Sequence, residues 1–331
     1  MSVVRYGLLS TAQIGINAHL PALRKSENSE VVSISSRGSA KAKAAAEEHD
    51  IDRWYGSYEE QLADPEMDAV INSLPNGMHC EWTIKAAAAG KHILCEKPLA
   101  VTAAECRRMI DAAAANGVLL VEAFTHRWSG HLRLARQRIA EGAIGKVATL
   151  DSCLCFTIAE PEGNVRFSPE LVGGGMWDAG CYAVYACRYV LDAEPVTVHA
   201  VSHDSGGWGV DTTFCGMMQF ADGAIANCTA SMEQPRRCTL SVDGSTGRIE
   251  IPDMFDDEGP VLICYSDERE DEEVATPSPG RFVVQLNEFS ECVLTGKSPE
   301  FPAADGLRNT AALEALYRAA ESGRGEPVGG V

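Results

Sequence analysis

The sequence predicts an α/β fold in two parts: a doubly wound parallel sheet, then an α+β domain with a large, mostly antiparallel open sheet. Over the first 123 residues, apolar runs of strand length alternate with helical segments, which is typical of a parallel sheet covered on both faces. After residue 145, such runs follow one another through short turns rich in Gly, Asp and Pro, which favours antiparallel pairing. We therefore expect domains over residues 1–123 and 124–331, with the last helix able to pack back on the first domain.

The first part contains five apolar runs with four helical segments between them. The predicted strands are residues 3–10, 30–36, 68–74, 91–96 and 118–124. The predicted helices are residues 12–26, 39–49, 79–90 and 102–117. Gly90 and Gly117 follow two of these helices, at the position where a left-handed residue commonly ends a helix.

The second part contains seven strand-like runs and three helices. The predicted strands are residues 146–158, 196–203, 212–220, 224–232, 238–244, 247–252 and 260–267. The predicted helices are residues 177–192, 281–296 and 304–323, beside a helical connection over 124–146. The densest acidic run, SDEREDEEVA over 266–275, is predicted to be a solvated hairpin tip or loop.

Composition excludes several classes of function. The formal net charge is −19, which disfavours nucleic acid and anionic membrane surfaces as partners. No apolar run reaches the roughly 18 residues that a membrane-spanning helix needs. The N-terminus enters a strand-like run directly and lacks the pattern of a secretory signal, so a cytoplasmic location is expected.

The 12 cysteines predict neither a disulfide scaffold nor a zinc site, because none is spaced C-x-x-C. Cys153 and Cys155 form the closest pair and are expected to point to one face of a strand. The histidines also lack ligand spacing, so no metal is expected.

The loop after the first strand, Ser10 to Gly15, stands where a dinucleotide-binding sheet has the fingerprint G-x-G-x-x-G. Only the last glycine is present, but Ser and Ala are small enough for the backbone to approach a pyrophosphate. Taken alone, the loop fits an ordinary strand–helix turn equally well. The residues expected to contact a cofactor here are Ser10, Thr11, Ala12 and Ile14.

The second predicted strand ends in Ser36 and Arg37, where an NAD site usually has an acidic residue that binds the ribose hydroxyls. Arginine cannot accept a hydrogen bond, but its guanidinium suits a phosphate. These residues favour the 2′-phosphate of NADP, with NAD as the alternative. A surface arginine in a polar turn is the structural alternative.

The stretch LCEKPLA places Glu96 and Lys97 at the carboxyl end of a buried strand, where ligands of parallel sheets bind. A lysine there can donate a proton or a hydrogen bond to a substrate oxygen. Pro98 restricts the backbone of Lys97, and a cis peptide before it would aim that side chain. The alternative is an exposed lysine that begins the next helix.

Five motifs in order along the chain resemble the Gfo/Idh/MocA family of NAD(P)-dependent oxidoreductases, over essentially its whole length. They are EKPLA (96–100), LPNGMH (74–79), VEAFTHRW (121–128), GGGMWDAGCYAVYACRYVL (173–191) and SGRGEP (322–327). The resemblance implies a Rossmann domain and a catalytic group of Lys97, Asp178 and Tyr182. Many relatives carry His in place of Tyr182. Tyrosine is typical of the branch resembling dimeric dihydrodiol dehydrogenases and NADP-dependent D-xylose dehydrogenases.

The resemblance also implies further site residues. Those expected at the cofactor are Leu74, Pro75, Asn76, His79, Glu96 and Lys97. Those expected at a sugar or diol are Arg166, Phe156, Phe167 and Arg127, with sheet packing as the alternative for Phe156.

The expected activity is hydride transfer between NADP and a hydroxyl or carbonyl carbon of a sugar or cyclic diol. Tyr182 would be the acid/base beside Lys97, and the alternative makes Lys97 the proton donor. Two other functions stay open: an NADPH-dependent reductase of a keto- or anhydro-sugar, and an NADP-binding sensor without turnover. The resemblance further implies a homodimer or homotetramer through the open sheet, unless the terminal helices cover that sheet.

Overall fold

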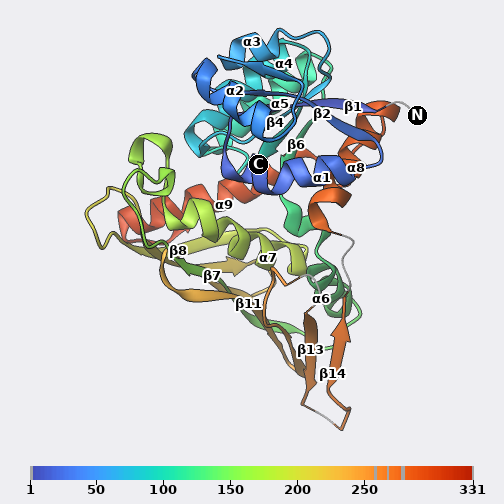
Figure 1. Ribbon diagram of the computed structural model, residues 1–331. Coiled ribbons are helices and arrows are strands. Elements are labelled where there is room, and N and C mark those ends of the chain that lie inside the picture. Colours follow the sequence, from blue (N-terminus) through green and yellow to red (C-terminus); the bar gives the residue numbers. More distant parts are fainter. Residues whose placement is uncertain (1–2, 257–258, 267, 277–279, 330–331) are drawn as a thin grey trace. The chain divides into compact units, whose positions relative to one another are not determined.

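The computed structural model describes residues 3–256, 259–266, 268–276 and 280–329 of the 331-residue chain (Figure 1). The chain divides into two compact units. The first comprises Met1–Thr125 and Pro279–Leu307, and the second comprises His126–Ser278 and Arg308–Val331. None of the helices in the described ranges is long and apolar enough to cross a membrane.

The first unit is built on a six-stranded, fully parallel sheet with the strand order β3-β2-β1-β4-β5-β6. This order confirms the predicted doubly wound sheet. The strands are β1 (Val4–Leu9), β2 (Ser29–Ser35), β3 (Arg53–Tyr55), β4 (Ala69–Asn72), β5 (His92–Glu96) and β6 (Leu120–Ala123). The sequence analysis did not predict β3, because three residues are too few to show a period.

Helices cover both faces of this sheet, as its apolar strands require. They are α1 (Leu20–Lys25), α2 (Ser39–Glu48), α3 (Tyr58–Leu62), α4 (His79–Ala88), α5 (Ala103–Ala115) and α8 (Arg281–Thr295). On one face Leu23 of α1 and Phe289 of α8 join a cluster with Leu8 and Leu94. On the other face Trp82 of α4 and Met109 of α5 join a second cluster. The segment predicted as one helix over 12–26 is a π-helix (Gly15–His19) followed by α1.

The second unit is built on a nine-stranded mixed sheet with the order β14-β13-β12-β11-β7-β10-β9-β8-β15. The pair β10–β7 is parallel and the remaining pairs are antiparallel, which confirms the predicted fold class. The strands are β7 (Val147–Thr157), β8 (Pro195–His203), β9 (Thr213–Phe220), β10 (Ile225–Ser231), β11 (Glu233–Gly244), β12 (Gly247–Ile251), β13 (Pro260–Tyr265), β14 (Glu272–Ala275) and β15 (Glu326–Pro327).

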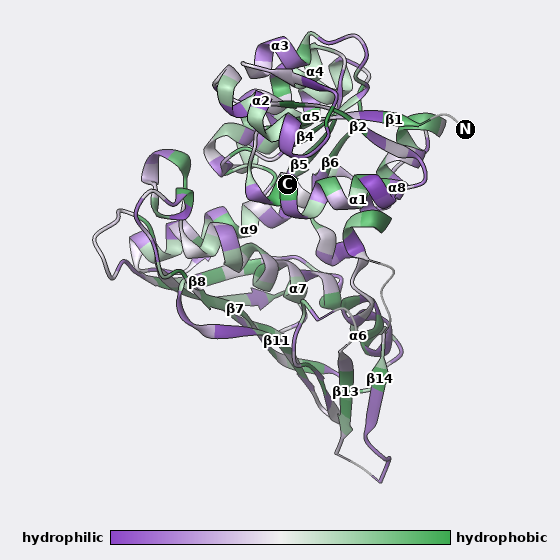
Figure 2. Cartoon of the chain, viewed as in Figure 1, coloured by the Kyte–Doolittle hydropathy of each residue, from purple (hydrophilic) through white to green (hydrophobic). Residues whose placement is uncertain are grey.

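The acidic run over 266–275 was expected to be a hairpin tip or loop, and that prediction is wrong for its last four residues. Glu272–Ala275 form β14, which pairs with β13 in antiparallel register, and Figure 2 shows its acidic half in purple beside the green of β13. Residue 267 of the run lies outside the described residues. Pairing satisfies backbone hydrogen bonds of these residues. The Glu273 carboxylate stays exposed, whereas that of Glu272 accepts from Arg138 at 2.9 Å and from the Tyr265 hydroxyl at 2.6 Å.

The large sheet has a covered face and an open one. Helix α7 (Cys181–Leu191) packs against β7, β10 and β11, and α6 (Gly130–Ala140) packs on α7. Helix α9 (Ala303–Ser322) contributes to both units, which divide after Leu307. Along β9, burial alternates strictly, so Phe214, Met218 and Phe220 are buried while Met217 between them is exposed. This alternation places every second side chain of β9 on the open face.

Candidate active site

The strand order of the first unit reverses between β1 and β4, and the loops after these two strands carry the predicted cofactor residues. Ser10, directly after β1, has φ 103°, a left-handed conformation that favours glycine. Its hydroxyl accepts the Ala12 N–H at 3.2 Å and donates to the Ser73 carbonyl at 3.3 Å. Serine thus occupies the position and conformation of the first fingerprint glycine, and its side chain joins the two loops. Thr11 and Ala12 are half-buried and Ile14 is 39% exposed.

The remaining glycine of the fingerprint allows a close approach to the loop after β4. A Cβ added to Gly15 would lie 3.2 Å from Ser73 Oγ. Asn72, the last residue of β4, is fully buried, and its amide donates to the His79 carbonyl and to Thr83 Oγ1, each at 3.2 Å. These bonds fix the segment that leads into Leu74, Pro75 and Asn76, where cofactor contacts are expected.

Ser36 and Arg37 follow β2 at the same sheet edge. Ser36 is buried and its N–H donates to the Tyr55 carbonyl of β3 at 3.2 Å. Arg37 is exposed, and Gly38 after it is the N-cap residue of α2. The backbone at Ser36 is therefore fixed, while the Arg37 guanidinium is exposed to solvent. This arrangement suits an arginine that binds a phosphate group of a ligand.

Glu96 is the last residue of β5 and Lys97 follows it, at the strand end where the EKP motif was expected, and the Lys97–Pro98 peptide is cis. Glu96 is 7% exposed, and its Oε1 lies 2.7 Å from Nε2 of the fully buried His19. Burial raises the pKa of Glu96, but the hydrogen bond and charge of His19, together with Lys97, outweigh burial and lower it. Glu96 is therefore an ionised, anchored carboxylate, and its Oε2 accepts the Lys97 N–H at 3.2 Å.

His79, the first residue of α4, is 1% exposed and contacts both the loop after β4 and the loop after β5. Its Nδ1 lies 2.8 Å from the Pro98 carbonyl oxygen and its Nε2 lies 2.8 Å from that of Leu74. Burial lowers the pKa of His79, while the two carbonyls and Glu96 act in the opposite direction. Both ring nitrogens are thus engaged by backbone of the protein.

In the second unit, a buried carboxylate anchors the glycine turn that precedes the predicted active-site helix. Asp211 Oδ2 accepts the Met176 N–H at 2.8 Å, and its Oδ1 accepts the Tyr317 hydroxyl at 2.6 Å. Gly174 has φ 113°, and a Cβ there would overlap Asp211 Oδ1. No sequence signal pointed to Asp211 or Tyr317, because they lie 35 and 141 residues beyond Met176.

The segment predicted as one helix over 177–192 is a π-helix, Met176–Gly180, that continues into α7. Asp178 lies in the π-helical turn, and Tyr182 is the second residue of α7. Such π-turns occur frequently at functional sites. The Asp178 N–H donates to the Gly174 carbonyl at 3.1 Å, so the anchored glycine turn sets the position of Asp178.

Arg166 pairs with Asp178. Its Nε donates to Asp178 Oδ2 at 2.6 Å, and the side chains are 42% and 19% exposed. The charge of Asp178 raises the pKa of Arg166, burial opposes this, and Tyr182 adds to the increase. The structure therefore brings together three of the predicted residues, Arg166, Asp178 and Tyr182, within one unit.

An aromatic group packs around the Tyr182 ring. The His126 ring centroid lies 4.7 Å from that of Tyr182, and the Phe255 centroid lies 5.1 Å from it. His126 and Phe255 contact each other edge to face at 4.2 Å. The sequence analysis did not single out Phe255, which follows β12 in a turn and carries no recognisable motif. The His126 and Phe255 rings therefore help to hold the Tyr182 phenol in one direction.

The other predicted substrate residues lie elsewhere in the second unit. Arg127 is fully buried, with its guanidinium carbon 5.7 Å from the Tyr185 ring centroid. Phe167 is buried and contacts the Trp208 ring at 5.3 Å, whereas Phe156 is half-buried in β7. Among the described residues, no group of three or more His, Cys, Asp or Glu side chains could hold a metal ion.

Comparison with known proteins identifies both parts of the chain. A family model described as "Oxidoreductase family, NAD-binding Rossmann fold" matches residues 4–124, and one described as "GFO/IDH/MocA C-terminal domain" matches residues 132–250. The chain is 35% identical over 321 residues to D-xylose 1-dehydrogenase (NADP(+)) 2 from Haloferax volcanii, covering 96% of this chain and 98% of that protein.

Two further relatives have similar coverage. Trans-1,2-dihydrobenzene-1,2-diol dehydrogenase from Mus musculus is 28% identical over 332 residues, 96% of each chain. The crystal structure of aldose-aldose oxidoreductase from Caulobacter crescentus, complexed with glycerol, matches with a TM-score of 0.88 at 30% identity. That match covers 98% of this chain and 99% of that one.

Stability should fall as pH rises through the titration of Asp211. Burial raises the pKa of Asp211 to about 6, although Tyr317 and backbone N–H groups lower it. Its value in the unfolded chain is about 3.9, so the folded state binds the proton more tightly and loses this advantage between about pH 4 and pH 6. The difference in unfolding free energy between Asp211→Asn and wild type should therefore shift by about 2 kcal/mol in favour of the variant as pH rises from 4 to 8.

Urea unfolding at a series of pH values measures this difference. Asp222→Asn is the matched control, because Asp222 is an exposed carboxyl of the same sheet in the β9–β10 turn. A constant difference between Asp211→Asn and wild type across this range would contradict the assignment.

Proposed function

Because this chain belongs to the Gfo/Idh/MocA family of NAD(P)-dependent oxidoreductases, we propose that it oxidises a sugar or cyclic diol with NADP. The observation that carries the proposal is the pairing of Arg166 with Asp178 beside Tyr182, on a π-turn anchored by Asp211. The EKP segment in the first unit supplies Lys97 on an anchored loop. These side chains suit a substrate that presents neighbouring hydroxyl groups.

The residues of the first unit fit a dinucleotide. The small side chains of Ser10 and Ala12 leave the backbone after β1 accessible, and the Ser73 contact holds that loop in place. Arg37 would meet the 2′-phosphate, and the loops at Leu74 and Glu96 would hold the nicotinamide end. When bound, the coenzyme supplies a ring carbon that accepts or donates hydride.

Tyr182 is assigned as the acid/base. In the oxidation direction its phenolate accepts the proton of the substrate hydroxyl as the carbon of that hydroxyl loses hydride. A cation near a phenol favours the phenolate. Lys97, together with Arg166, would stabilise the Tyr182 phenolate in this way. Asp178 would orient the substrate hydroxyl or Lys97. In the alternative assignment, Lys97 itself exchanges the proton and Tyr182 orients the hydroxyl.

The same groups serve the reverse reaction, in which Tyr182 returns the proton to a carbonyl oxygen and the product is an alcohol. Reduction of a keto- or anhydro-sugar is therefore the second candidate, favoured by the same site geometry. A sensor that binds NADP without turnover does not require Asp178 to be held by the buried Asp211. The presence of Lys97, Asp178 and Tyr182 together therefore supports an enzyme.

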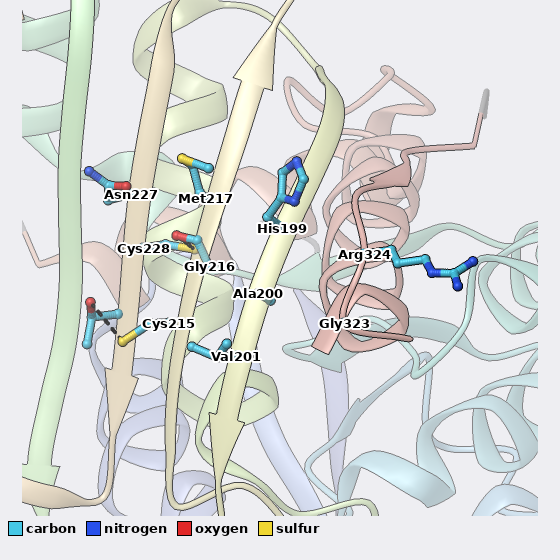
Figure 3. A pocket seen from close by; sticks show the side chains of 11 residues that line it. His199, Ala200, Val201, Cys215, Gly216, Met217, Asn227, Cys228, Gly323 and Arg324 are labelled. Atoms are coloured by element: carbon cyan, nitrogen blue, oxygen red, sulfur yellow. Dashed lines mark hydrogen bonds between the residues drawn. The ribbon is translucent and has the colours of Figure 1, made fainter. Parts of the chain in front are cut away.

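We propose a homodimer or homotetramer formed through the open face of the large sheet. On β8, β9 and β10, the apolar side chains of Val201, Met217 and Ile225 are 69%, 41% and 38% exposed. A groove of about 520 Å³ on the sheet is lined by residues that include Val201, Met217, His199 and Arg324. Figure 3 shows these side chains on the strands and beside the C-terminal segment. Exposed apolar residues that gather on one sheet face favour burial against another subunit.

Reduction of NADP at 340 nm with a panel of aldoses and trans-dihydrodiols tests the activity. Arg37→Ala should raise the KM for NADP about tenfold to a hundredfold and leave that for NAD nearly unchanged, because charge-assisted bonds to the phosphate are lost. Lys43→Ala is the control, since Lys43 is exposed on α2, the helix that follows Arg37, and pairs with Glu47 at 3.7 Å. Equal effects on both coenzymes would remove the role given to Arg37.

Tyr182→Phe should lower kcat about a hundredfold or more while the coenzyme affinity stays within twofold, because only proton transfer is lost. Steady-state rates and a coenzyme fluorescence titration measure the two effects. Tyr189→Phe removes a hydroxyl from the same helix and should have little effect on kcat. Turnover that survives in Tyr182→Phe would assign the proton to Lys97.

Met217→Lys should shift the protein toward the monomer, because a charge on the open sheet face would have to be desolvated on association. Light scattering after size-exclusion chromatography measures the mass. Lys146→Glu is the control variant, because it changes a charge at an exposed position just before β7 and leaves Met217 in place. A wild-type protein that elutes as a monomer would refute the dimer.

A further inference from the structure

His79 joins two loops that the sequence places far from each other. Leu74 follows β4, and Pro98 follows β5 next to Lys97. The carbonyl oxygens of Leu74 and Pro98 each lie 2.8 Å from a different ring nitrogen of His79. With 1% of its surface exposed, the ring lies between the loops rather than in solvent.

Two other anchors of the Lys97 loop reach it from His19 and from β6. The His19 ring binds Glu96, and Glu122 Oε1 accepts the Leu99 N–H at 2.7 Å. Glu122 is fully buried in β6. Neither contact involves the loop after β4, so these anchors fix the Lys97 loop to the sheet but not to its neighbour.

We propose that His79 is a positioning residue that ties the loop at Leu74 to the loop at Lys97, and that it acts through these loops rather than by touching the coenzyme. The inference rests on the proposed function, in which the first loop binds the coenzyme and the second carries Lys97. The tie sets the spacing between a bound nicotinamide and the Lys97 backbone. Loss of the tie should therefore affect binding and turnover separately.

The chemistry of imidazole makes the two halves of the tie separable. Both carbonyl oxygens can only accept, so the ring donates to both loops when it is protonated and to one of them, at Nδ1 to Pro98 or at Nε2 to Leu74, when it is neutral. An asparagine amide reaches about as far as Nδ1, and a glutamine amide reaches about as far as Nε2. His79→Asn thus keeps a donor for Pro98, and His79→Gln keeps a donor for Leu74.

Hydrogen exchange measured by mass spectrometry, without substrate, tests each half. In His79→Asn, exchange should increase in the peptide that covers residues 73–78, and the Kd for NADPH should rise about tenfold, as expected for one lost buried hydrogen bond. In His79→Gln, exchange should increase over residues 97–101 instead. Its kcat should fall about tenfold while the NADPH Kd stays within threefold.

His92→Asn is the matched control. His92 begins β5 at the opposite sheet edge, and its Nδ1 accepts the Leu119 N–H at 2.9 Å, which an asparagine oxygen can replace. Neither loop nor NADPH affinity should change in this variant. If both His79 variants lower only the melting temperature, with loop exchange and NADPH affinity unchanged, the ring is simple packing and the proposal is overturned.

The outcome for His79 is separable from that for the proposed activity. Exchange and NADPH titration need no substrate, so a panel in which no sugar or diol is oxidised would refute the activity alone. Equal changes of both loops in both variants would also overturn the inference, because they would show general loosening instead of two separate ties.

Discussion

The parallel pairing of β1, β4 and β5 is the constraint on which the first unit depends. Parallel strands bring their carboxyl ends to one edge, so loops that start 63 and 24 residues apart become neighbours there. Each loop then needs partners for its backbone groups. The side chains of Ser10, Asn72 and His79 supply partners, and the contacts of Ser10 and His79 also join one loop to another.

Buried ionisable groups recur where the loops must be held firmly. Removing a charge from water costs several kcal/mol unless a partner compensates. Glu96 has His19 and a backbone N–H, and Asp211 has Tyr317 and the Met176 N–H. Each arrangement makes one geometry much better than its alternatives, because any shift of the loop would leave a buried charge without its partner.

The second unit uses the same principle to place a helix. Three successive glycines allow the chain to turn tightly against Asp211, and the π-turn that follows presents Asp178 to Arg166. The His126 and Phe255 rings lie against Tyr182. Hydrogen bonds thus position the carboxylate, and aromatic contacts contribute to the position of the phenol.

The sequence by itself determined the fold class, most strands of both sheets to within about five residues, and the motifs around Lys97 and Asp178. These features are local: apolar periodicity, turn residues and short motifs are visible in a window of about ten to twenty residues. Two short strands, β3 and β14, were not predicted, because a strand of three or four residues is defined by its pairing with a neighbouring strand rather than by a pattern of its own.

Only the tertiary structure decided which side chains hold the site. His19 meets Glu96 across 77 residues, and Asp211 meets Met176 across 35, so no local pattern connects them. The left-handed Ser10 is likewise a consequence of its hydroxyl reaching Ser73 in another loop. Sequence patterns record what each segment prefers alone, whereas these anchors arise from the free energy of burying polar groups that different segments bring together.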